Sequence, residues 1–369
     1  MNATRAVDLE DTEGLLGADR QGLLRAASSA GAQVRAIAAA ADEGALDSLR
    51  TDDPPRSVIW VAGRGTAETA GSMLAATLGG AASAPIALTG EAPPWVGPLD
   101  VLIVAGDDPG DPALVTAAAT GVRRGARVVA VAPYEGPLRD SAAGRAAVLA
   151  PRLWIPDEFG LCRYLAAGLA AVKTVDPRPS IDLELLADEL DAEALRNSAG
   201  RELFTNPAKT LAARMADRRV ALAGDCAATL ALARHGSSVL LRIAQRVAAA
   251  TGLADAVVAL GAPDAPPSMD ALFHDEDIDG PLPERLRVLA LTLAAERAVV
   301  ATRVAGLDDV DLVAAEDVPD LPDGVGGPDG SAGSDRTRGS TGAGRAEQQL
   351  AVLAVRLEMA AVYMRLVRG

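Results

Sequence analysis

Short runs of apolar, largely β-branched residues alternate with helix-forming segments along most of the chain, and this alternation restricts the fold more than any other feature. Runs such as SVIWVA (57–62) and ARVVAVA (126–132) are typical of strands buried on both faces of a parallel sheet. The helical segments between the runs favour an α/β fold with helices on both faces of each sheet. Strands are predicted at 57–62, 85–88, 100–106, 126–132, 145–151, 219–225, 256–260, 287–292 and 310–315.

The pattern pauses near the middle of the chain and then restarts, so we expect two tandem, doubly wound parallel-sheet domains. Residues 19–42 are predicted to form one amphipathic helix before the first strand. A mixture of Gly, Pro, Ser and Asp predicts disorder near the C-terminal end, and the apolar face of the final helix is predicted to dock on its own chain or on a partner subunit. The predicted organisation is a helical segment at 1–50, a first α/β domain at 51–175, a second at 176–316, a disordered linker at 317–345 and a docking helix at 346–369.

The charge and the apolar pattern exclude several classes of partner. A formal net charge of −15 argues against nucleic-acid binding, which depends on neutralising phosphates with Lys and Arg. The N-terminus has no basic-then-apolar signal pattern, and no apolar run reaches about 18 residues, the length that a membrane-spanning helix needs. We therefore expect a cytoplasmic protein without a membrane or nucleic-acid partner. The two cysteines are not in a CxxC spacing, so neither a metal site nor a cofactor is predicted.

A glycine-rich turn after the first strong strand is the first motif with functional meaning. The segment VAGRGT (61–66) resembles the first phosphosugar loop of sugar isomerase (SIS) domains. Two such layers closed by a C-terminal helix are similar to the bifunctional phosphoglucose/phosphomannose isomerases, most of all to the degenerate actinobacterial branch called TobH-like. The resemblance covers 50–316 and 346–369, and it implies SIS-type, flavodoxin-like domains.

The first loop departs from the pattern that this resemblance implies. In the SIS family the loop is Gly-x-Gly-Gly-Ser-Gly, in which backbone amides and a serine hydroxyl hold the sugar or its phosphate. Here Ala67 takes the place of the serine, and Glu68 adds a negative charge where an anion is expected. The glycines alternatively serve only tight strand-to-helix packing. The candidate ligand-binding residues of this loop are Gly63, Arg64, Gly65, Thr66, Glu68 and Thr69.

The second loop, GDDPGD (106–111), departs further. The family has Ser-x-Ser-Gly-x-Thr here, whose hydroxyls and amides bind phosphate, whereas this chain offers Asp107, Asp108 and Asp111. Three carboxylates repel a phosphate dianion, and Pro109 has no amide hydrogen to donate. The three aspartates are candidate contacts for a changed ligand; alternatively Asp111 only caps the helix that begins at Pro112.

The acid–base residues that the resemblance implies are also altered. Aldose–ketose isomerisation needs a carboxylate base, and the position of the family's glutamate falls on Arg242. Arg242 is a candidate anion ligand or a residue of a solvated helix face. The family's ring-opening histidine aligns with His274, a weak candidate for a catalytic proton shuttle that is alternatively an exposed histidine in an acidic loop. The segment Asp275–Gly280 also matches the first half of a calcium loop, without the glutamate at its twelfth position.

Three hypotheses for function follow. The first is a SIS-type protein with impaired or lost isomerase activity that binds a sugar phosphate or nucleotide sugar, or a protein partner, in a regulatory role. The second is an active isomerase that converts mannose 6-phosphate or glucose 6-phosphate to fructose 6-phosphate through a rearranged site, with His274, Glu68 or Asp108 as acid and base. The third is a structural partner subunit of a mannose-metabolism enzyme. The resemblance also implies a homodimer.

Overall fold

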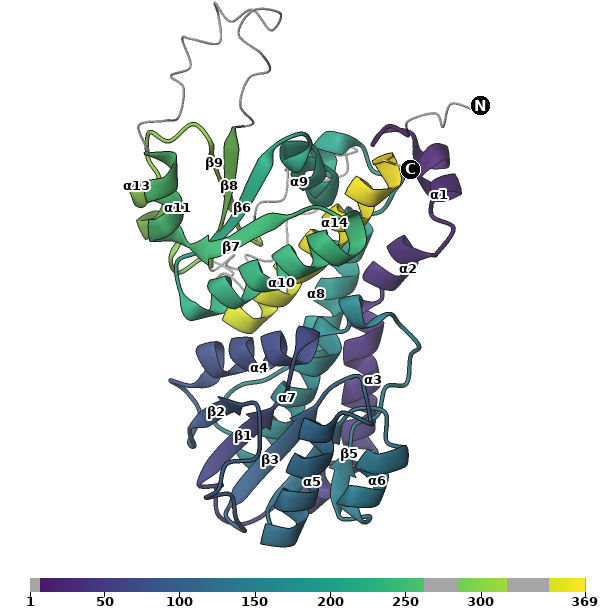
Figure 1. Cartoon of the computed structure of the whole chain (residues 1–369), viewed down its shortest axis with the longest axis vertical. Coiled ribbons are helices and arrows are strands. Elements are labelled where there is room, and N and C mark those ends of the chain that lie inside the picture. Colours follow the sequence, from purple (N-terminus) through teal and green to yellow (C-terminus); the bar gives the residue numbers. More distant parts are fainter. Residues whose placement is uncertain (1–6, 262–284, 317–344, 369) are drawn as a thin grey trace, which may run out of the picture.

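The computed structural model describes residues 7–261, 285–316 and 345–368, which form two parallel sheets with a layer of helices between them. Figure 1 shows the first sheet in the lower half of the molecule and the second in the upper half. The strand orders are β2-β1-β3-β4-β5 and β7-β6-β8-β9, and every pairing is parallel. The predicted α/β fold with two doubly wound parallel sheets is therefore confirmed.

The first sheet follows the apolar runs of the sequence. Its central strands β1 and β3 are buried along their whole length, as expected of strands covered by helices on both faces. Alternate residues of β1 enter different cores: Trp60 packs against α4 and α7, while Ile59 belongs to the core that includes α5. The bounds are β1 Ser57–Val61, β2 Ile86–Thr89, β3 Asp100–Ala105, β4 Arg127–Val131, β5 Ala146–Val148, α4 Gly65–Leu78, α5 Pro112–Arg124, α6 Gly136–Ala142 and α7 Leu161–Val175.

The second sheet corrects one predicted strand. Residues 256–260 lie in the helix α11, and the strand beside β6 is Ala248–Gly252 instead. Leu253 and Ala256 of α11 are buried and Val258 is 74% exposed, which is a helical spacing that a five-residue window does not separate from a strand. The remaining bounds of this half are β6 Arg219–Gly224, β7 Ala248–Gly252, β8 Leu286–Leu291, β9 Val310–Val313, α11 Leu253–Leu260 and α13 Arg297–Arg303.

Helices from both ends of the chain share the central layer. The predicted helix at 19–42 is two helices, because Ser28 and Ser29 lie between α2 and α3, and α3 packs against α7 and α8. The last helix, α14, contacts α10, α9 and α8 of its own chain. It is buried on all sides and not on one face, so its apolar surface is not open to a partner subunit. The layer comprises α1 Thr12–Ala18, α2 Leu23–Ala27, α3 Ala30–Asp42, α8 Leu183–Arg196, α9 Pro207–Met215, α10 Ala227–Ala244 and α14 Ala346–Arg368.

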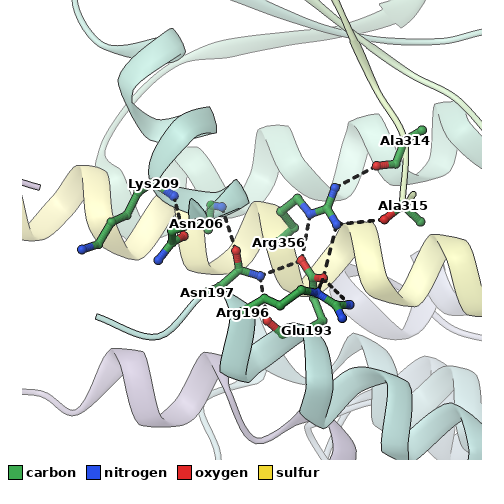
Figure 2. Close-up of polar contacts among 9 residues, drawn as sticks. Glu193, Arg196, Asn197, Asn206, Lys209, Ala314, Ala315 and Arg356 are labelled. Carbon is green, nitrogen blue, oxygen red and sulfur yellow. Dashed lines mark hydrogen bonds and ion pairs between the residues drawn. The ribbon is translucent and has the colours of Figure 1, made fainter. Parts of the chain in front are cut away.

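A buried polar network attaches α14 to the rest of the molecule (Figure 2). The Arg356 guanidinium donates to the Glu193 carboxylate at 2.8 and 3.2 Å, and to the carbonyls of Ala314 at 2.8 Å and Ala315 at 3.1 Å. Burial raises the pKa of Glu193, but the charge and hydrogen bonds of Arg356, together with Arg196 and Asn197, outweigh burial and lower this pKa. One ion pair thus joins α8, α14 and the segment after β9.

The segment that follows α7 and leads to the second sheet is also held by a buried carboxylate, that of Asp176. Asp176, directly after α7, accepts hydrogen bonds from the amide of Ser83 at 2.5 Å and from its hydroxyl at 2.6 Å. Burial raises the pKa of Asp176, but these bonds and those from Arg178 lower it to about 2. In the part of the chain that the structure describes, none of the helices combines the length and apolar character needed to cross a membrane.

Candidate functional site

The two predicted loops meet at the carboxyl edge of the first sheet. They follow β1 and β3, which are neighbours in the sheet, so their ends adjoin. The Arg64 guanidinium lies 3.7 Å from the Asp108 carboxylate across the two loops. A β-carbon placed on Gly63 would lie 3.6 Å from a carboxylate oxygen of Asp111. Residues that are more than 40 positions apart in the sequence therefore form one surface.

The second loop is organised around its own aspartates. Asp111 caps α5 by accepting the amide of Ala113 at 2.9 Å, so the predicted capping role is confirmed. Asp108 accepts the amide of Gly110 at 2.8 Å and stays exposed. Asp107 lines a cavity of about 210 Å³ together with Asp157 and Arg163. The loop thus presents carboxylates, which repel a phosphate, where the resemblance implies hydroxyls.

The first loop leads directly into α4. This helix begins at Gly65, whose φ of +67° favours glycine. The Thr66 hydroxyl donates to the Asp157 carboxylate at 3.2 Å, and the Thr69 hydroxyl donates to the Gly65 carbonyl at 3.3 Å. Glu68 is exposed in the first turn. Both threonine hydroxyls are therefore already engaged within the chain.

Arg242 lies beside the same loop, although it comes from the second half of the chain. It is in the last turn of α10, a helix that packs against α4. Its guanidinium contacts the Asp157 carboxylate at 3.3 Å and the Glu158 carboxylate at 2.8 Å, and its side chain is 41% exposed. Both acids belong to η2 (Asp157–Phe159), the turn before α7. Arg242 is therefore ion-paired and is not simply a residue of a solvated face.

A hollow of about 170 Å³ lies between parts of α4 and α10 and is lined by most of these groups. Its walls combine hydroxyls, two carboxylates and basic side chains, which is the chemistry of a site for a small polar ligand. The residues around it are Gly65, Thr66, Glu68, Thr69, Ser72, Glu158, Ala231, Arg234, His235, Ser238, Val239 and Arg242.

A buried pair that the sequence did not predict joins His235, which lines this hollow, to Glu358 of α14. The Nε2 atom of His235 lies 2.8 Å from Oε1 of Glu358, and both side chains are 2% exposed. Burial raises the pKa of Glu358, and the hydrogen bond from His235 opposes that rise. A carboxylate between Leu357 and Met359, in a helix stretch (351–364) whose only other charged residue is Arg356, was the available signal, because such a group needs a buried partner.

His274 and the calcium-like segment 275–280 lie outside the described residues. Within residues 7–261, 285–316 and 345–368, no group of three or more His, Cys, Asp or Glu side chains could hold a metal ion.

Comparison with solved structures places the fold. Tagatose-6-phosphate ketose/aldose isomerase from Escherichia coli matches with a TM-score of 0.58 at 16% identity, covering 100% of this chain and 95% of that one. A protein from Silicibacter pomeroyi described as a phosphosugar isomerase matches with a TM-score of 0.57 at 15% identity, covering 93% of this chain and 95% of that one. A glucose-6-phosphate isomerase-like protein from Thermus thermophilus matches with a TM-score of 0.52 at 20% identity, covering 98% and 96%.

These matches show that the chain has the fold of tandem SIS domains, as found in phosphosugar isomerases. At these identities the likeness concerns the fold and not the chemistry of the site. No protein-family model matches the chain, and no curated protein matches it in sequence.

Proposed function

We propose that this chain is a carbohydrate-derivative-binding SIS protein of the TobH-like branch, with impaired or lost aldose–ketose isomerase activity and a binding or regulatory role. The observation that carries the proposal is the position of the Asp157 carboxylate. It accepts from the Thr66 hydroxyl, contacts Arg242, and lies 3.6 Å from a β-carbon placed on Gly65, the first residue of α4.

The N-terminus of a helix attracts anions through its free amides and its dipole. At α4 an internal carboxylate lies near this end of the helix, and it engages a hydroxyl and a guanidinium that would otherwise be free for a ligand. A sugar phosphate that reaches the N-terminus of α4 must therefore displace Asp157 or bind beside it against repulsion. No carboxylate stands at the Arg242 position to move the proton between C1 and C2.

Removing the internal carboxylate tests the proposal. Asp157→Ala should strengthen the binding of fructose 6-phosphate, seen as a larger rise in melting temperature than in the unchanged protein. The matched control is Asp188→Ala, which removes a carboxylate from an exposed pair with Arg35. A coupled assay should detect no conversion of glucose 6-phosphate or mannose 6-phosphate by any of the three proteins. Steady turnover by the unchanged protein would contradict the proposal.

The pair His235–Glu358 favours a second candidate, an active isomerase with a rearranged site. An imidazole hydrogen-bonded to a carboxylate at the wall of a polar hollow is an arrangement that accepts and returns protons. The SIS-type structures from E. coli and T. thermophilus are named for reactions of tagatose 6-phosphate and glucose 6-phosphate. This candidate predicts turnover of such a substrate that disappears in His235→Gln while the melting temperature is retained. Activity that survives this substitution would exclude the pair as the acid–base group.

A further inference from the structure

A second cavity, of about 520 Å³, lies at the amino edge of the second sheet. It is formed where β6, β7 and β8 begin and where α9, α10 and α14 end. The hollow beside Gly65 lies at the carboxyl edge of the first sheet instead. The two sites have no lining residue in common. The lining residues are Met215, Arg218, Arg219, Val220, Leu240, Gln245, Arg246, Val247, Ala248, Ala249, Leu286, Met364 and Arg368.

This cavity concentrates positive charge in a chain whose net charge is −15. Four of its thirteen lining residues are arginines, and none is Asp or Glu. Within the described residues, the one carboxylate that forms an ion pair with these arginines is that of Asp217, which lies 3.6 Å from Arg246 and is 98% exposed. Solvent screens such a pair strongly. The positive charge of the cavity is therefore left largely uncompensated by the described residues.

One donor of the cavity wall has no partner among the described residues. The Nε atom of Arg246 is buried and makes no hydrogen bond there. Buried donors are nearly always satisfied, by protein, water or ligand. An oxygen placed in the cavity beside Arg246 would meet this requirement.

Helix ends account for only part of the basic character. The carboxyl end of a helix carries partial negative charge, and basic residues there are ordinary. That role is already filled for α10, because Arg365 donates to the carbonyl of Ile243 at 3.1 Å, and Arg214 stands in the last turn of α9. Arg368 likewise stands in the last turn of α14, whereas Arg218 and Arg219 lie outside these helices and are additional.

We propose that this cavity binds an organic phosphate that carries two or more negative charges. Planar guanidinium groups bind phosphate oxygens in a bidentate manner. The side chains of Met215, Leu240 and Met364 provide an apolar wall for the carbon skeleton. Because these residues belong to α9, α10 and α14, the bound ligand would hold three helices of the central layer together at one point.

Calorimetric titration with inorganic pyrophosphate, at fixed ionic strength, tests the charge requirement. We expect saturable binding that the double substitution Arg218→Gln/Arg219→Gln weakens by about tenfold or more, since two charge-assisted contacts are lost. The matched control is Arg123→Gln, an exposed arginine on α5 of the other sheet. Asp157→Ala, which removes the carboxylate beside Thr66 at the start of α4, should also leave the pyrophosphate affinity unchanged.

Arg368→Gln provides an independent variant if the double substitution disturbs folding, because this side chain is exposed at the end of α14. It should also weaken pyrophosphate binding, with a melting temperature near that of the unchanged protein when no ligand is added. Absence of saturable binding overturns the proposal, and so does binding that the cavity variants and Arg123→Gln weaken equally. Neither result bears on isomerase activity or on sugar-phosphate binding beside α4.

Discussion

Replacing Arg356 with leucine should destabilise the protein by about 3–5 kcal/mol, because it leaves a buried carboxylate without its main partner. The Arg356 side chain is 2% exposed and Glu193 is 0% exposed, so water does not replace the lost contacts. The substitution also removes the donors to the carbonyls of Ala314 and Ala315 (Figure 2). Since Arg356 lowers the pKa of Glu193, its loss should be felt most above the ordinary pKa of 4.5 and less as the pH falls below that value.

A matched substitution separates burial from charge. Arg196 donates to the same Glu193 carboxylate at 2.9 and 3.1 Å, but its side chain is 32% exposed. Arg196→Leu should therefore cost only about 1 kcal/mol, as partly exposed pairs do. The free energies of unfolding come from urea titrations of each variant by linear extrapolation. Equal losses for the two arginine variants would refute the argument from burial.

Three further substitutions test single features of the fold. Asp176→Asn should destabilise the protein by about 2 kcal/mol at neutral pH, because the pKa of Asp176 is lowered from 3.8 to about 2 in the folded state. This loss of stability should fade as the pH falls through that range. A loss that is independent of pH would exclude the bonds from Ser83 as its cause. Gly224→Ala should lower the free energy of unfolding in urea by about 1–3 kcal/mol, because its β-carbon would lie 2.3 Å from the backbone nitrogen of Leu230. In the control Gly63→Ala the nearest atom to the new β-carbon lies 3.6 Å away, so little loss is expected. Similar losses for the two variants would contradict the steric argument. Trp60→Phe should lower the free energy of unfolding by about 2 kcal/mol, because the hydrogen bond of a fully buried indole is lost and the smaller ring leaves a cavity. An unchanged midpoint in urea would be inconsistent with this packing.

The sequence determined the sheets where the strands are rich in β-branched residues. The runs at 57–62 and 126–132 coincide with β1 and β4, because Val and Ile in short blocks fit a doubly covered sheet. The strand β7 was missed since AAATG (248–252) has only one β-branched residue, Thr251, and depends on pairing with β6. The burial of α14 on all sides was missed as well, because its contacts come from helices that lie far away in the sequence.

The candidate site was predictable in place but not in its contacts. The loops after β1 and β3 had to meet, because the carboxyl ends of adjacent parallel strands share one edge. The partners of Thr66 and Arg242 were not predictable, since Asp157 lies 91 and 85 positions away from them on a turn without a motif. The pair His235–Glu358 spans 123 positions and likewise depends on how α10 and α14 pack.

The central place of α14 has a consequence for how the polypeptide emerges from the ribosome. Residues 57–175 can cover their sheet with their own helices during synthesis, because α4, α5, α6 and α7 all lie within that span. The second sheet depends on a later segment: α10 and β6 are complete by residue 244, and α4 is available to pack against α10, but α14, which also packs against α10, begins only at Ala346. The part of the α10 surface that α14 covers is thus left open to solvent while about a hundred more residues are translated, and this interval is the period of greatest exposure to proteases and to self-association.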